Sequence, residues 1–165
     1  MNYFEKVSYE IYEKAVGGDE YLGEEYDEII VPHRSTKYSA GYDFFAPCDI
    51  DLKDGEEIVI PTGIRCVLDR NKVLLIVPRS GLGFKYGMKL ANTVGVIDAD
   101  YAGSDNMGHI FAKIVNDNSK GEVLHIKKGS AFMQGIIVQY HTCDEDDVQT
   151  IRNGGFGSTD ILASA

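Results

Sequence analysis

The sequence predicts an all-β domain, and two observations lead to this fold class. Short runs rich in Val, Ile and Leu recur at residues 57–60, 64–68, 73–77, 110–115, 123–126 and 132–140. Turn-forming residues separate these runs, among them Asp54-Gly55, Thr62-Gly63 and Lys128-Gly129. Many short strands at this spacing are typical of a sandwich, a jelly roll or a barrel.

The segment before these strands has a different pattern. Its apolar residues have the spacing of one face of a short helix, and they are Phe4, Val7, Ile11, Tyr12 and Ala15. Gly17-Gly18 ends this helix, and an acidic stretch over residues 19–28 leads into a strand-like run at residues 29–31. We therefore predict an N-terminal helix and acidic linker over residues 1–28, a β core over residues 29–143 and a flexible C-terminal arm over residues 144–165.

Composition limits the class of function. The 165 residues are 44% hydrophobic and 25% charged, which is ordinary for one globular domain. The formal net charge of −10 disfavours polymeric nucleic acid as a partner, although a single nucleotide needs only a few local cations or a metal ion. The apolar runs are too short to span a bilayer, and the first 14 residues hold no apolar signal segment. Three widely separated cysteines argue against a disulfide framework or a zinc site, so we expect a cytoplasmic protein.

Residues 152–159 read RNGGFGST and combine glycines with one cation, one aromatic ring and two hydroxyls. This segment has little to bury and a high backbone entropy, so it is not a core strand. A frayed terminus is the plain interpretation. The residue types also suit an arm that orders over a bound nucleotide, because its glycines leave N–H groups free to face an anion.

Two segments carry residues suited to a phosphoester reaction. Arg79-Ser80-Gly81 follows the run at residues 73–77, where Ser80 is placed to cap a short helix that stops at Gly87. A helix start beside a cation and a hydroxyl can hold a phosphate, but a simple cap with a surface charge is the more frequent case.

Asp98 and Asp100 lie two apart, on one side of an extended chain, and a carboxylate there can activate a water molecule. On spacing alone, two solvated acids at a strand end are the better explanation of this pair.

Two further polar residues stand in apolar surroundings. Asp43 enters the Phe44-Phe45 run and could hold Mg²⁺ through its waters, or could be a turn residue. Gln134 lies inside the apolar run at residues 132–138, so it is either a satisfied buried amide or a donor facing a ligand.

Five motifs follow one another along the chain: AGYDFF at 40–45, PRSGLG at 78–83, NTVGVIDADYAG at 92–103, GSAFMQ at 129–134 and RNGGFGST at 152–159. In this set and order the chain resembles the homotrimeric dUTPase family, as a bacterial or phage-like member with an N-terminal extension. The resemblance covers about residues 29–160. It implies a jelly-roll β-sandwich that assembles as a homotrimer with active sites between subunits. The implied reaction is Mg²⁺-assisted hydrolysis of dUTP to dUMP and pyrophosphate.

The resemblance also implies a role for each motif residue. Asp98 matches the base that activates water, Tyr101 matches the residue that packs on the deoxyribose, and Asp43 matches the carboxylate that contacts Mg²⁺ through water. The uracil edge would be read by Asn92, Gly95, Val96 and Ile97. Phosphates would be bound by Arg79, Ser80, Gly81 and Gln134. The arm of another subunit would contribute Arg152, Phe156, Gly157, Ser158 and Thr159.

The chain departs from the family pattern at three places. Ser130 and Ala131 replace an acid and an arginine of the fourth motif, the fifth motif is one residue shorter after Arg152, and the third motif continues into a longer loop at residues 104–109. Two rivals stay open: a dCTP deaminase, and a nucleotide-sensing regulator that binds a protein partner. The loop at residues 104–109 and residues 1–28 are where a surface for such a partner would lie.

Overall fold

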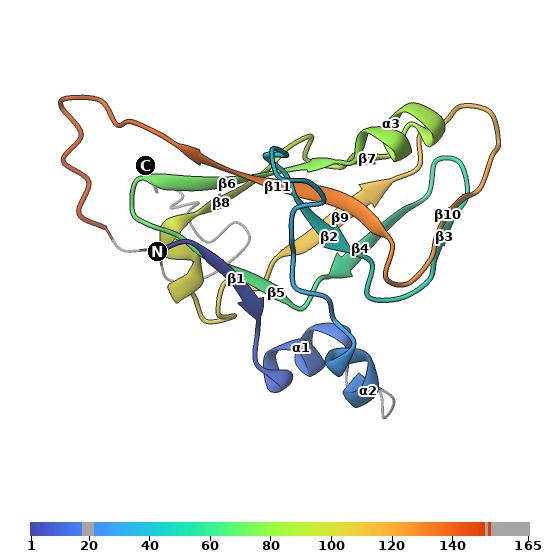
Figure 1. Cartoon of the computed structure of the whole chain (residues 1–165), viewed down its shortest axis with the longest axis horizontal. Helices are drawn as coiled ribbons and strands as arrows, with labels where there is room; N and C mark the ends of the chain where they lie inside the picture. The colour runs from blue at the N-terminus through green and yellow to red at the C-terminus, as the bar shows by residue number, and fades with distance from the viewer. Residues whose placement is uncertain (18–21, 151, 153–165) are drawn as a thin grey trace, which may run out of the picture.

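This computed structural model describes residues 1–17, 22–150 and 152, and antiparallel strands dominate it (Figure 1). The largest sheet has the order β2–β11–β6–β8, with bounds Tyr42–Phe45, Ala131–Gln139, Lys72–Pro78 and Gly95–Asp98. A second sheet has the order β4–β9–β7, with bounds Glu57–Pro61, Phe111–Val115 and Lys89–Leu90. Two strand pairs complete the fold: β1 (Tyr3–Lys6) with β5 (Ile64–Val67), and β10 (Leu124–Ile126) with β3 (Ile50–Leu52). The predicted all-β, jelly-roll-type fold class is confirmed.

One apolar core holds the sheets together. In β6, Leu74 and Ile76 are buried while their neighbours are half-buried, which is the alternation expected of a strand with one core face. Phe132 of β11 and Ile114 of β9 are fully buried in the same cluster, so the two larger sheets share it. Each such side chain contributes about 1.5–3 kcal/mol on burial.

The N-terminal segment is a strand followed by two helices, which corrects the single helix predicted over residues 4–16. Residues Tyr3–Lys6 form β1, because Phe4 packs against Tyr42 and Phe44 while its backbone pairs with β5. Helix α1 (Tyr9–Val16) starts only after Ser8, whose hydroxyl accepts the Ile11 N–H, and it ends at Gly17 as predicted. Helix α2 (Leu22–Asp27) lies within the stretch expected to be a linker, and both helices sit at one end of the molecule (Figure 1).

Two other local predictions were wrong. Residues 29–31 form no strand; the Ile29 N–H instead donates to the Tyr26 carbonyl at the end of α2. Helix α3 (Ser80–Tyr86) begins at Ser80 and ends at Gly87, but Arg79 occupies the cap position and makes no side-chain capping bond. Gly87 has φ +61°, and a Cβ there would overlap the Asp117 carbonyl, so a glycine is required.

Among the described residues, no helix is long and apolar enough to cross a membrane.

Candidate active site

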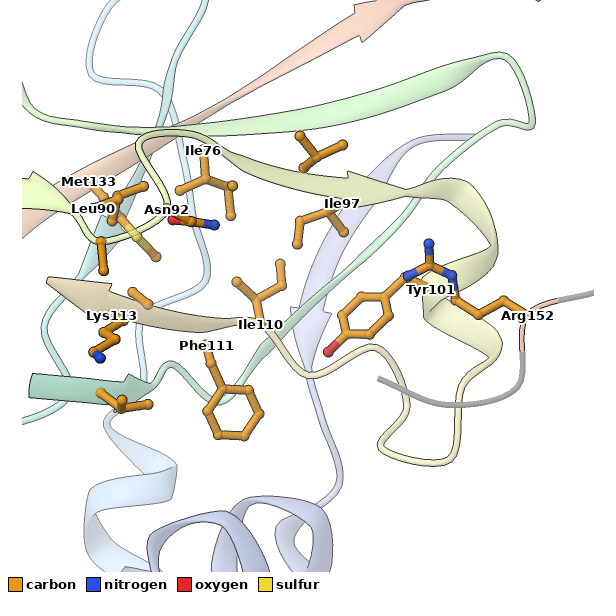
Figure 2. A pocket seen from close by; sticks show the side chains of 15 residues that line it. Ile76, Leu90, Asn92, Ile97, Tyr101, Ile110, Phe111, Lys113, Met133 and Arg152 are labelled. Atoms are coloured by element: carbon orange, nitrogen blue, oxygen red, sulfur yellow. The ribbon is translucent and has the colours of Figure 1, made fainter. Parts of the chain in front are cut away.

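A cavity of about 590 Å³ opens beside β8, and we call it the β8 pocket (Figure 2). Its wall is mostly apolar and comes from β4, β6, β8, β9, β11 and the turn before β8. Six residues that the resemblance implies for the site line it: Asn92, Gly95, Val96, Ile97, Tyr101 and Arg152. Figure 2 shows Asn92 near Ile76 and Leu90, and Tyr101 with Arg152 at the other end.

A tight turn carries Asn92 to the mouth of the pocket. Thr93 has a left-handed backbone with φ +68°, and the Val94 N–H donates to the Asn92 carbonyl at 2.7 Å. Gly95 then pairs with Ile76 of β6, and a Cβ on Gly95 would stand only 3.1 Å from the Ile76 Cβ. The glycine therefore lets β8 lie close to β6.

Tyr101 forms one wall of the pocket and is fixed at its hydroxyl. It lies in the 3₁₀ helix η1 (Ala99–Gly103) and is 6% exposed. Its hydroxyl donates to the His109 carbonyl at 2.8 Å and accepts from the Asn106 amide at 2.9 Å. Burial raises the pKa of Tyr101, so the phenol is neutral at physiological pH.

Asp98 ends β8 and is not itself a lining residue of the pocket, but it is paired with Arg152, which is. An Arg152 Nη2 donates to Asp98 Oδ2 at 2.6 Å, and Arg152 Nε lies 3.3 Å from Asp100 Oδ1. The guanidinium also lies 5.9 Å from the centre of the Tyr101 ring. The chain turns into η1 directly after Asp98, so it does not stay extended as the spacing argument assumed, and both carboxylates reach the same cation through this turn.

The other residues that the resemblance implies lie at the opposite end of β6, and we call Asp43, Arg79, Ser80, Gly81 and Gln134 the strand-end cluster. Arg79 Nε lies 3.6 Å from Asp43 Oδ1, and the Ser35 hydroxyl donates to Asp43 Oδ2 at 2.5 Å. Gln134 of β11 stands opposite Asp43 in the ladder, so their side chains share a face. Ser80 and Gly81 are exposed at the start of α3. None of the five lines the β8 pocket.

The strand register places Asp98 and the strand-end cluster at opposite ends of β6 within one chain. Asp98 pairs with Val73 at the start of β6, whereas Arg79 follows Pro78 at its end. Six residues of extended chain span about 20 Å. Asp98 and Arg79 therefore cannot contact the same phosphate group in a single chain.

Phe156, Gly157, Ser158 and Thr159 lie outside the described residues. Within residues 1–17, 22–150 and 152, no group of three or more His, Cys, Asp or Glu side chains is placed to hold a metal ion.

The sequence did not predict the two residues that bond the Tyr101 hydroxyl, Asn106 and His109. The fully buried ring of His109 accepts the Gly63 N–H at Nε2 (2.8 Å), and its centre lies 4.4 Å from the centre of the Phe111 ring. Burial lowers the pKa of His109 from 6.5 to about 4. The extra length after Gly103 was the available signal, but it does not reveal which side chains turn back toward Tyr101.

Comparison with known proteins agrees with this fold. A family model for dUTPase matches residues 27–161. The chain is 40% identical over 134 residues to the deoxyuridine 5'-triphosphate nucleotidohydrolase of Lactococcus lactis, covering 79% of this chain and 88% of that one. It is 35% identical over 140 residues to the protein of that name from Neisseria meningitidis, covering 80% and 89%. The crystal structure of dUTPase from Streptococcus mutans superposes with a TM-score of 0.65 at 28% identity, covering 86% of this chain and 98% of that one.

These matches, together with the β8 pocket, define the class of the protein as a nucleotide hydrolase. The chain belongs to the dUTPase family.

Proposed function

We propose that this chain hydrolyses dUTP to dUMP and pyrophosphate, through attack on the α-phosphorus by a water molecule that Asp98 activates. The observation that carries the proposal is the hydrogen bond between the Asp98 carboxylate and Arg152, because Arg152 lines the same pocket as Asn92 and Tyr101. The reaction would limit uracil in DNA and supply dUMP for dTMP synthesis. The three cysteines, all free thiols, suit a cytoplasmic setting for it.

The β8 pocket suits the nucleoside part of dUTP. Its volume of about 590 Å³ falls in the range of about 300–1,000 Å³ that small-molecule sites occupy. The Asn92 amide and the backbone of residues 95–97 offer donors and acceptors for the uracil edge, and the apolar wall excludes water from it. The neutral Tyr101 ring would pack on the deoxyribose and leave no room for a 2′-hydroxyl.

Asp98 has the exposure that a general base for water needs. Its side chain is 44% exposed, so water can reach the carboxylate directly. Arg152 donates to one of its oxygens. The family resemblance assigns Arg152 to the arm that reaches the site of another subunit, where the guanidinium would bind a phosphate, and both Asp98 oxygens would then be open to water. A positioned base contributes about 10²–10⁴-fold to rate.

The triphosphate would be bound by the strand-end cluster of a second copy of the chain. Arg79 supplies charge, and Ser80, Gly81 and Gln134 supply hydrogen-bond donors. The roughly 20 Å between the two ends of β6 supports this division, because one chain cannot close both groups on one substrate. We therefore propose a homotrimer with active sites between subunits, completed by the arm residues Phe156, Gly157, Ser158 and Thr159.

Asp43 is suited to a magnesium ion held by phosphates. Mg²⁺ in phosphate sites keeps several waters and uses few protein carboxylates. Asp43 is one nearly buried carboxylate, and both of its oxygens lie beside polar groups, Arg79 and Ser35, at the proposed phosphate site. This donor set fits contact through water. When bound, Mg²⁺ would neutralise phosphate charge. The dUTPase of phage phi11, 21% identical to this chain, coordinates a structural Mg(II) ion.

A regulatory protein partner has no specific observation in its favour. Over the described residues, β1 pairs with β5 and Tyr12 of α1 packs near His109, so the N-terminal segment faces the core.

The test is incubation with dUTP, dCTP, dTTP and UTP in Mg²⁺, with pyrophosphate and nucleoside products measured. Pyrophosphate from dUTP alone supports the proposal. Ammonia from dCTP would place the chain among deaminases, and tight dUTP binding without turnover would favour a sensor over an enzyme.

A further inference from the structure

Residues 104–109, which we call the Tyr101 loop, fold back onto Tyr101 in the preceding 3₁₀ helix η1. Ser104 and His109 are buried at its two ends. Met107 and Gly108 have left-handed backbones, with φ of +57° and +72°. A Cβ on Gly108 would stand 2.7 Å from the Ala102 Cα and 2.8 Å from the Tyr101 carbonyl oxygen. The loop therefore packs backbone against backbone on η1, which only glycine permits at this position.

This packing places the Asn106 side chain beside the Tyr101 hydroxyl. Its Oδ1 accepts the Gly108 N–H at 3.1 Å and lies 2.7 Å from the Ser104 hydroxyl. An N–H can only donate, so the amide oxygen must face Gly108 and the amide nitrogen must face Tyr101. Asn106 Nδ2 then donates to the Tyr101 hydroxyl at 2.9 Å.

The second partner of that hydroxyl is equally fixed. The Tyr101 O–H donates to the His109 carbonyl, and the His109 ring is held by the Gly63 N–H and packed near Phe111 and Tyr12. Arg65 of β5 donates to the Ala102 carbonyl at 2.9 Å, which fixes the backbone of η1 beside Tyr101. The ring is thus held at its backbone and, at its far end, by one donor and one acceptor.

We propose that the Tyr101 loop holds the aromatic wall of the β8 pocket in place, and that Asn106 is the positioning residue through which the chain rejects ribonucleotides. The inference rests on the proposed function, since it assigns Tyr101 to the sugar. To exclude a 2′-hydroxyl, the Tyr101 ring must keep its position when a nucleotide binds, because small displacements in a site change its selectivity. A tyrosine held at its hydroxyl as well as at its backbone moves less than one held by its backbone alone. Asn106 does not line the pocket, so its effect passes through Tyr101.

The experiment compares Asn106→Ala, Tyr101→Phe and the double variant with the full-length chain. Asp105→Ala is the matched control, because Asp105 is the neighbouring exposed residue of the same loop. The readout is the ratio of kcat/KM for dUTP to kcat/KM for UTP. Loss of one hydrogen bond predicts that Asn106→Ala lowers this ratio about two- to tenfold. Tyr101→Phe removes the same bond, so the double variant should be no worse than the more affected single variant.

A second readout does not need turnover. With ¹³C-labelled tyrosine, NMR follows how fast the Tyr101 ring flips, and Asn106→Ala should accelerate the flip while Asp105→Ala leaves it unchanged. A lower melting temperature with an unchanged dUTP to UTP ratio would overturn the inference, because that is the result of a merely structural residue. Additive losses in the double variant would also overturn it.

Failure of the proposed function would be visible separately. If the wild-type chain releases no pyrophosphate from dUTP, the proposed function fails, and binding of dUDP and UDP by calorimetry replaces the kinetic ratio. Equal affinity of the wild type for dUDP and UDP would overturn the role in sugar selection. A ring flip unaffected by Asn106→Ala would overturn the positioning itself.

Discussion

The β8 pocket and the strand-end cluster differ in how complete each is within one chain. The pocket has a mostly apolar wall, and its Tyr101 is 6% exposed with both hydrogen-bonding functions of the hydroxyl satisfied. In the cluster, the Arg79 side chain is 44% exposed, and its contact with Asp43 is a 3.6 Å ion pair. Ser80 and Gly81 beside it are also exposed.

This difference matches the chemistry that each region would perform. Recognition of a base and a sugar depends on shape, so its residues must be rigid before the ligand arrives. Binding of a mobile triphosphate depends on charge, and exposed cations and hydroxyls can adjust to it. On the proposed function, the pocket would recognise the base and the sugar, and the cluster would bind the triphosphate of a substrate seated on another copy.

The largest expected loss of activity comes from a substitution on the pocket side. Asp98→Asn keeps the size of the side chain but removes the base, so kcat for dUTP should fall about 10²–10⁴-fold while dUTP still binds. Asp100→Asn is the matched control, because Asp100 contacts the same Arg152 and should change kcat little. Rates come from pyrophosphate release and affinities from calorimetry. Equal losses in the two variants would mean that the acids serve only to hold Arg152.

A smaller effect is expected at the cluster. Arg79→Ala removes a cation from the proposed triphosphate site, and kcat/KM for dUTP should fall about 10- to 100-fold, since a charged hydrogen bond contributes about 1.5–3 kcal/mol. Arg70→Ala, at an exposed arginine near the other end of β6, should leave steady-state kinetics unchanged. Similar losses for both arginines would point to the general charge of the surface rather than to the cluster.

The third effect concerns stability rather than rate and belongs to the pocket side alone. The pKa of His109 is lowered to about 4 by burial, so its contribution is complete above pH 6.5 and is lost as pH falls toward 4. The wild type should therefore lose up to about 3 kcal/mol more unfolding free energy between pH 7 and pH 4 than His109→Gln does. Urea denaturation at several pH values measures this, with His141→Gln, at an exposed histidine, as control. Parallel pH curves for wild type and His109→Gln would show that the buried ring is not the titrating group.

The sequence could predict those features that depend on local patterns. Runs rich in Val, Ile and Leu, with turn residues between the runs, located β6 and β11, and Gly87 located the end of α3. Strand β1 could not be predicted, because its four residues become a strand only through pairing with β5 and through the packing of Phe4 on β2.

The candidate site shows the same division. The motifs named Asp98, Tyr101 and Arg79, but the register of β6, a long-range property, sets the distance between them. The bonds of Asn106 and His109 to Tyr101 also escaped prediction, since they depend on how one loop folds over η1.

The most direct test of the central claim is complementation between two variants with impaired activity. Chains carrying Asp98→Asn and chains carrying Arg79→Ala are co-expressed, and dUTP hydrolysis by the mixed assembly is measured. If the pocket of one copy works with the cluster of another, random assortment should restore about a quarter of wild-type activity. If mixing restores no activity although mass spectrometry finds mixed assemblies, each site is built within one chain and the account is wrong.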